Sequence, residues 1–256
     1  MNGKNTFSEV PATPEQVLGI FQDWQRLELG RTPDDKETFT FNTTVCEWFD
    51  SADFLDWKTV SKGLNEFFTT NFAKDEWQAA MKPEKEKTLR DVCTLISSRA
   101  MLPALNEAKI FGASCKAASA FLALRARLQL AGVDAAKLRP SAKLDDFLRL
   151  HTQTMVNAIQ KLAPGRMPKV KAKSNLAHRL FAWTALACLV VLVASEIFSA
   201  HFLSATSCMA LILSFIGIAV CSHFPPARVQ IEGLETFADL SHLIAGEGEA
   251  RGGQQC

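Results

Sequence analysis

Glu196 is the residue whose position in the sequence could most readily support chemistry. It is the only formally charged residue between Leu180 and Ala227. A carboxylate inside an apolar segment is costly, and such residues hold a proton or an ion, or pair with a neighbouring helix. His201 follows five residues later and could meet Glu196 near a turn. One histidine and one carboxylate make a poor metal site. Two interpretations therefore remain: Glu196 reaches the outer lipid headgroups, or Glu196, with His201 as a second candidate residue, serves as a proton or ion site or as a clamp between helices of an oligomer.

Histidine and cysteine elsewhere in the chain form no catalytic or metal-binding pattern. His151 lies between Leu148 and Met155 at helical spacing, which is typical of a partly buried core residue. The seven cysteines include no C-x-x-C pair and suit a reducing compartment. Glycine-rich phosphate loops, zinc-protease motifs and nucleophile elbows do not occur. The sequence therefore favours a protein without enzymatic activity and predicts neither a metal nor a cofactor.

One stretch resembles an acyl carrier protein in outline. Asp50-Ser51 is followed by a helical pattern, and then by the sequence TLRDVCTLI over residues 88–96. In that family, the serine of an Asp-Ser-Leu motif carries the prosthetic arm, so the resemblance implies this role for Ser51. Here Ala52 follows the serine, and the next helical pattern is two or three residues longer than in the family. A helix cap explains Ser51 equally well.

Two apolar segments, 180–198 and 205–224, contain or flank the candidate membrane residues. Each has about 20 residues, and at about 1.5 Å per residue each spans a hydrocarbon layer of about 30 Å. The turn between them, 199–204, is short, so we expect a transmembrane helical hairpin over 180–224. Buried helices of a soluble protein are the alternative, but 31 residues without a charge follow Glu196 before Arg228. The pair Ala210-x-x-x-Ser214 would permit close helix packing and a homo-oligomer.

The flank before the first apolar segment is strongly basic. Residues 161–180 hold six basic residues and no acidic one, and the turn 199–204 holds no lysine or arginine. The positive-inside rule therefore places both termini in the cytoplasm. We expect the basic residues to contact the headgroups of an anionic inner leaflet, although they could serve only as an orientation signal. These residues are Lys161, Arg166, Lys169, Lys171, Lys173 and Arg179.

The rest of the chain reads as an all-α protein. We expect a soluble helical domain over 1–162, a basic linker over 163–179, and a cytosolic tail over 225–256. Within the domain, capping patterns and apolar spacing predict helices that start at Thr13, Thr44 and Thr88, and further helices over 51–70, 113–131 and 142–162. A short helix around Trp77 ends near Pro83. After the membrane, apolar residues over 229–244 predict an amphipathic helix, on the membrane surface or on the domain. Internal repeats are not visible.

The domain carries no charge imbalance that would suit nucleic acid. Residues 1–160 hold 20 basic and 21 acidic residues, a net charge of −1. We therefore expect a membrane-anchored protein that tethers a cytosolic interaction or sensing domain to the bilayer and binds an unidentified protein partner. The alternative is a two-helix membrane effector that oligomerises and perturbs the bilayer, with Glu196 as the functional acid.

Overall fold

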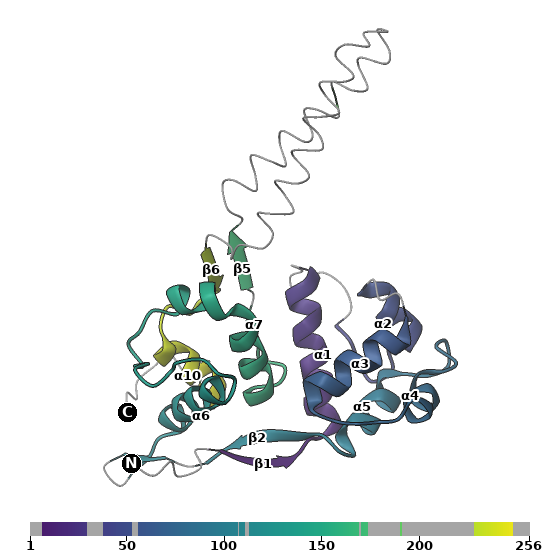
Figure 1. Ribbon diagram of the computed structural model, residues 1–256, viewed down its shortest axis with the longest axis horizontal. Helices are drawn as coiled ribbons and strands as arrows, with labels where there is room; N and C mark the ends of the chain where they lie inside the picture. The colour runs from purple at the N-terminus through teal and green to yellow at the C-terminus, as the bar shows by residue number, and fades with distance from the viewer. Residues whose placement is uncertain are drawn as a thin grey trace. The chain divides into compact units, whose positions relative to one another are not determined.

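The computed structural model describes most of the chain outside the apolar segments (Figure 1). The described residues are 7–29, 38–52, 56–106, 108–110, 113–168, 170–173, 190 and 228–247. The chain divides into two compact units, one made of 1–144, 153–170 and 231–256, the other of 145–152 and 171–230. The described part is mostly helical, which confirms the helical class expected from the sequence.

Five helices follow one another in the first half of the chain. They are α1 (Pro14–Leu29), α2 (Val45–Ser51), α3 (Trp57–Phe68), α4 (Lys74–Met81) and α5 (Leu89–Ser97). The predicted starts hold: the Thr13 hydroxyl accepts from Gln16 N at 3.3 Å, and Thr44 and Glu47 form a capping box before α2. The predicted helix 51–70 begins later than expected, because Asp56 rather than Ser51 caps α3.

An aromatic core holds these five helices together. Phe21 of α1 stacks between Trp24 and Trp48, with ring centres 5.3 and 5.0 Å apart. Phe21 is fully buried, and Trp48 is 2% exposed. Burying side chains of this size contributes about 1.5–3 kcal/mol each to folding. Most aromatic side chains of the first five helices therefore belong to the core or pack against it.

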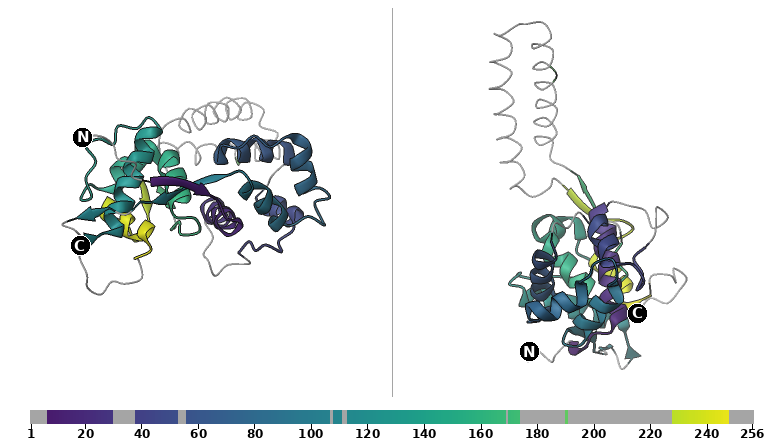
Figure 2. Two further views of the ribbon diagram at one scale, coloured as in Figure 1. Left: turned by 90° about the horizontal axis from the view of Figure 1, so that it is seen from below. Right: turned by 90° about the vertical axis from the view of Figure 1, so that its right-hand side faces the viewer.

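Short antiparallel strands connect the helices, and the sequence did not predict them. β1 (Phe7–Pro11) pairs with β2 (Met101–Leu105), in a register that sets Phe7 opposite Leu105 (Figure 2, left). β3 (Lys109–Ile110) pairs with β4 (Ala113–Ser114). The β1–β2 pair joins segments about 90 residues apart, a separation that local patterns do not report.

The described residues from 116 onward form two long helices, two strands and a final helix, apart from the single residue Val190. These are α6 (Lys116–Leu130), α7 (Leu144–Leu162), β5 (Val170–Lys173), β6 (Arg228–Ile231) and α10 (Phe237–Ala245). α10 packs along α6, so the tail after the apolar stretch docks on the domain. The predicted helix 229–244 is wrong over its first residues, which form β6. β5 and β6 pair with each other (Figure 2, right).

The two halves close in the same way, which corrects the expectation of no internal repeat. In each half, three backbone hydrogen bonds tie the last helix to the chain before an earlier helix. In the first half they are Val45 N to Lys87 O, Leu89 N to Thr43 O, and Arg90 N to Phe41 O. In the second half they are Leu144 N to Glu235 O, Phe237 N to Ala142 O, and Ala238 N to Pro140 O. The spacing of donors and acceptors is identical in both sets.

The sequence of the closing helix also repeats. Residues 88–96 read TLRDVCTLI and residues 236–244 read TFADLSHLI, with the same threonine, aspartate, leucine and isoleucine at matching positions. Thr88 with Asp91, and Thr236 with Asp239, form capping boxes. The closing helix packs on the first long helix of its half in both cases, α5 on α1 and α10 on α6. The two halves are therefore copies of one helical module.

The copies differ between their third helix and their closing helix. α2 corresponds to residues 144–150 of α7, and the break before α3 corresponds to His151, whose φ of −132° and ψ of 32° kink α7. Between α3 and its closing helix, the first copy contains α4. The second copy contains β5, residues 174–227 and β6 instead. The apolar stretch thus replaces α4.

The predicted hairpin, 180–198 and 205–224, lies outside the described residues apart from Val190. Val190 is helical, and its side chain is 61% exposed. Among the helices that the structure describes, none has both the length and the apolar character needed to cross a membrane.

Candidate functional site

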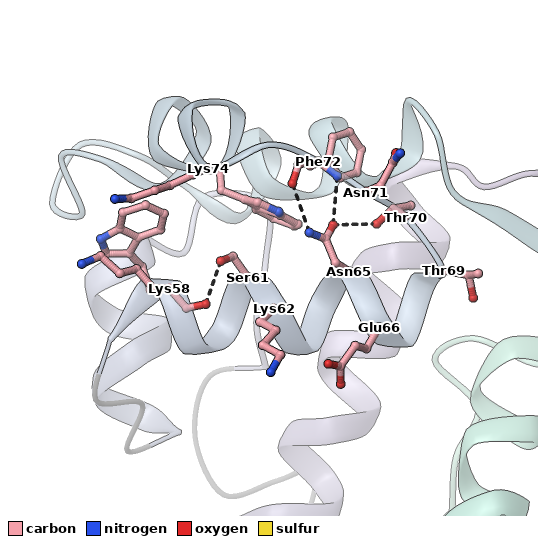
Figure 3. Close-up of a pocket in the computed structure, with 12 residues that line it drawn as sticks. Lys58, Ser61, Lys62, Asn65, Glu66, Thr69, Thr70, Asn71, Phe72 and Lys74 are labelled. Atoms are coloured by element: carbon pink, nitrogen blue, oxygen red, sulfur yellow. Dashed lines mark hydrogen bonds between the residues drawn. The ribbon is translucent and has the colours of Figure 1, made fainter.

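A groove between α3 and α4 is the candidate site of the first copy. Two adjoining cavities of about 840 and 750 Å³ form it, and both are lined by Trp57, Lys58 and Lys74. α3 supplies one wall, and the loop 69–73 with the start of α4 supplies the other (Figure 3). The groove lies outside the set of residues that the sequence singled out.

The wall formed by the loop is fixed by the Asn65 side chain. Asn65 Oδ1 accepts from Phe72 N at 3.2 Å and from the Thr70 hydroxyl at 3.0 Å, and Asn65 Nδ2 donates to Phe72 O at 3.1 Å (Figure 3). Thr69 ends α3 in the left-handed region with φ 56°. These bonds order the loop before any ligand arrives, which lowers the entropy cost of binding.

Lysines give the groove its charge. Lys58 and Lys62 come from α3, and Lys74 and Lys82 from the two ends of α4. Lys82 pairs with Glu84 at 2.6 Å. Among the described residues, Lys58, Lys62 and Lys74 form no ion pair. Lys58 and Lys74 extend to the same end of the groove (Figure 3).

Trp77 is a buried lining residue with an unused donor. Its side chain is 1% exposed and lies edge-on to Phe72, with ring centres 5.5 Å apart. Its indole Nε1 has no hydrogen-bond partner. An unpaired buried donor costs about 1–3 kcal/mol. The groove therefore combines exposed cations with a donor that lacks an acceptor, and this arrangement suits a ligand with anionic and carbonyl oxygens.

A second cluster holds the segment that leads toward the apolar stretch. Asp23 of α1 is fully buried and accepts from Gly165 N at 2.8 Å and from Met167 N at 3.0 Å. Arg26 Nη1 lies 3.0 Å from Asp23 Oδ1 and donates to Gly165 O at 2.9 Å. These bonds clamp the turn 163–167 to α1, a few residues before β5.

Burial dominates the protonation of Asp23. Loss of hydration raises its pKa to about 6, although the Met167 and Gly165 amides and the Arg26 guanidinium act in the opposite direction. The three polar neighbours are all donors, so they stabilise the carboxylate through hydrogen bonds. Loss of hydration works against the same charged form.

The basic flank is only partly described. Lys161 of α7 lies with Nζ 4.8 Å from the Phe67 ring centre, and burial, with help from Arg127, lowers its pKa to about 8. Arg166 is exposed. Lys171 and Lys173 belong to β5, and their side chains are outside the description, as are Lys169 and Arg179 altogether. Headgroup contact by these residues stays a prediction.

Glu196 and His201 also lie outside the described residues, so their role stays a prediction. His151 marks the kink of α7, and its ring centre lies 4.9 Å from that of Phe147. Ser51 is the last residue of α2, and its hydroxyl donates to Trp48 O at 2.9 Å. Among the described residues, no group of three or more His, Cys, Asp or Glu side chains could hold a metal ion.

Comparisons with protein-family models, curated proteins and solved structures find no significant match to this chain. The sequence reasoning missed Asp23 and the α3–α4 groove. In α1, Asp23 lies three residues after Ile20 and directly precedes Trp24, so its position on the apolar side was a readable signal. The groove carried no such signal, because lysines and tryptophans at helical spacing are typical of any amphipathic helix.

Proposed function

We propose that this chain is a two-span membrane protein that tethers an α-helical cytosolic interaction domain to the bilayer. The observation that carries the proposal is the contact between α6 and α10, two helices that lie on either side of the apolar stretch in the sequence. Two segments that pack together must be on the same side of a membrane. A chain that crosses between them must therefore cross an even number of times, and two apolar segments of about 20 residues supply two crossings.

The paired strands β5 and β6 support the same topology. They directly flank residues 174–227, so the chain leaves the domain and returns to it at one place. A helical hairpin with a short outer turn requires its two ends to lie close together in this way. The exposed Val190 side chain is the kind of surface that lipid would cover. The basic residues of the flank favour the cytosolic side for the domain and an anionic leaflet as its neighbour.

Sedimentation and tag accessibility test the tether. In a lysate without detergent, we expect the full-length protein in the membrane pellet, resistant to alkaline carbonate and released by detergent. Tags at the two ends should both be accessible only after the membrane is permeabilised. A tag inserted at Ser204 should be accessible in intact cells. A protein that stays in the supernatant, or ends that label on opposite faces, would contradict the proposal.

The membrane-effector function is the second candidate, because Glu196 is the one charge in the apolar stretch. An oligomer formed through Ala210 and Ser214 would place several such carboxylates together. Liposomes loaded with dye should then leak with the wild-type protein and leak much less with Glu196→Ala. Leakage that is absent, or equal for both proteins, favours the tether alone.

A further inference from the structure

We propose that the groove between α3 and α4 binds an acidic polypeptide segment of a partner protein. The proposal names the partner surface of the tether and rests on that function only for its location at a membrane. Its basis is a juxtaposition of exposed lysines, an aromatic lining and an unused buried donor.

The first step is charge. Four lysines line the two cavities against the carboxylates of Glu66 and Asp75, and three of the four, Lys58, Lys62 and Lys74, form no ion pair among the described residues, whereas Lys82 is paired with Glu84. The domain as a whole is close to neutral, so this excess of cations is local. A lysine binds carboxylates as a point charge without demanding a fixed geometry. The interspersed Glu66 and Asp75 disfavour a polyanion with a uniform run of phosphates, and they favour a ligand whose charges are separated by neutral groups.

The second step is the donor at Trp77. Its Nε1 is buried and unpaired in a side chain that borders the groove. A peptide carbonyl or a carboxylate oxygen is an acceptor of the right kind. Because Nε1 itself is covered, pairing requires a shift of the side chains over it, and it would then recover the cost of the unmade bond. Trp57, which is half-buried and borders both cavities, offers apolar surface next to this point.

The third step is length. α3 has 12 residues, so its wall extends about 18 Å. An extended chain rises about 3.3 Å per residue, so about five or six residues fill this length. Two adjoining cavities suit such a segment better than a single compact headgroup.

The fourth step comes from the repeat. In the second copy, residues between β5 and β6 take the place of α4, and no counterpart of the α3–α4 groove occurs among its described residues. One copy then carries the anchor, and the other carries the binding surface.

A peptide titration tests the proposal on the full-length protein in uncharged detergent micelles. The probe is a fluorescein-labelled hexapeptide of alternating glutamate and leucine, followed by fluorescence anisotropy. We expect binding that weakens as salt increases. The double variant Lys58→Glu/Lys74→Glu should lower the affinity about tenfold or more, since it reverses two charges at one end of the groove. The matched control, Lys116→Glu/Lys137→Glu, reverses two exposed lysines elsewhere, one of them also the first residue of a helix, and should change the affinity less than about twofold.

Trp77→Phe tests the donor separately. The phenylalanine keeps an aromatic lining but removes the N–H, so binding should weaken about threefold to tenfold. The free energy of unfolding should not fall, because the lost group has no partner. Near-UV circular dichroism checks that both variants are folded.

Several outcomes would overturn the proposal. One is that the hexapeptide does not bind at a concentration of about 1 mM, which corresponds to a weak affinity. The others are that a lysine–leucine hexapeptide binds equally well, or that the groove variants leave the affinity unchanged. If phosphatidylserine vesicles bind with the same sensitivity to Lys58→Glu/Lys74→Glu while the hexapeptide does not bind, the groove is a lipid site. Reconstitution into phosphatidylcholine vesicles reports membrane insertion independently, so failure of the groove is distinguishable from failure of the tether.

Discussion

Asp23 shows how one residue can join two copies of a module. It sits on α1 of the first copy and accepts hydrogen bonds from two backbone amides just after α7 of the second copy. Trp24, its neighbour, donates from Nε1 to Gln160 Oε1 at 3.2 Å across the same boundary. A polar contact of this kind is specific in geometry but sensitive to protonation, because burial works against the charged form.

The pH dependence of stability should reveal Asp23. The folded protein keeps a proton on Asp23 up to a pKa of about 6, whereas an unfolded chain releases it near the ordinary value of 3.8. Between these values the folded state binds more protons, so the free energy of unfolding should fall as the pH rises through this window. Ionisation of Asp23 should lower the free energy of unfolding by up to about 3 kcal/mol over this window.

Denaturant unfolding at several pH values, followed by tryptophan fluorescence, measures this effect. Other carboxyl groups titrate in the same range, so the quantity of interest is the difference between the wild type and Asp23→Asn. The asparagine does not ionise, so its stability should lack this part of the pH slope. Parallel curves for the two proteins would show that Asp23 titrates normally.

At the scale of elements, close approach of backbone decides where glycine is required. Gly19 lies on α1 against the turn after α7, and a Cβ built there would stand 3.0 Å from Gly165 N. Gly165 itself has φ 78°. The close approach therefore disfavours a side chain at position 19, whereas the positive φ favours glycine at position 165.

Gly19→Ala and Gly63→Ala form a matched pair of tests. Both glycines lie inside helices, but a Cβ at Gly63 meets nothing within 4 Å. We expect Gly63→Ala to raise the free energy of unfolding by about 0.5–1 kcal/mol, through helix propensity. Gly19→Ala should lower it by about 1–3 kcal/mol, because the new methyl group meets backbone that cannot rotate away. Thermal or denaturant unfolding measures both, and stabilisation by Gly19→Ala would show that α1 and the turn are not in close contact.

Elements with local signals were predictable from the sequence, and elements with distant partners were not. The starts of α2 and α5 were predictable, because a capping box is complete within four residues. These boxes are Thr44 with Glu47 and Thr88 with Asp91. β1 and β2 contain Pro11 and Pro103 and pair over a long separation, so no local pattern marked them. The repeat stayed hidden because only the closing helix keeps a similar sequence, and long insertions separate the matching parts. The groove needed α3 and α4 together, and neither helix alone predicts it.

At the scale of the molecule, the chain consists of two modules, and the apolar stretch lies within the second. Each module closes on itself through the same backbone bonds, and the apolar stretch enters the second module between paired strands. An insertion whose ends are held side by side leaves the surrounding fold intact. We therefore expect the domain to fold without residues 174–227.

Replacing residues 174–227 by a short glycine–serine linker tests this modularity. The shortened protein should remain in the supernatant without detergent and should unfold in one cooperative transition. Hydrogen exchange should show protected amides in α10, because its packing on α6 does not involve the replaced residues. A product with helical far-UV circular dichroism but no protection in α10 would indicate that the membrane segment is needed to complete the second module.

The packing of α10 on α6 also has a consequence for synthesis. The buried face of α6, which includes Phe121, Leu124 and Leu128, emerges from the ribosome more than a hundred residues before α10 does. Until then, this face has no cover from its closing helix, and the whole apolar stretch is synthesised in the interval. The second module therefore closes only after the apolar stretch has been made, and a chain stalled before residue 237 would present the α6 surface to chaperones and proteases.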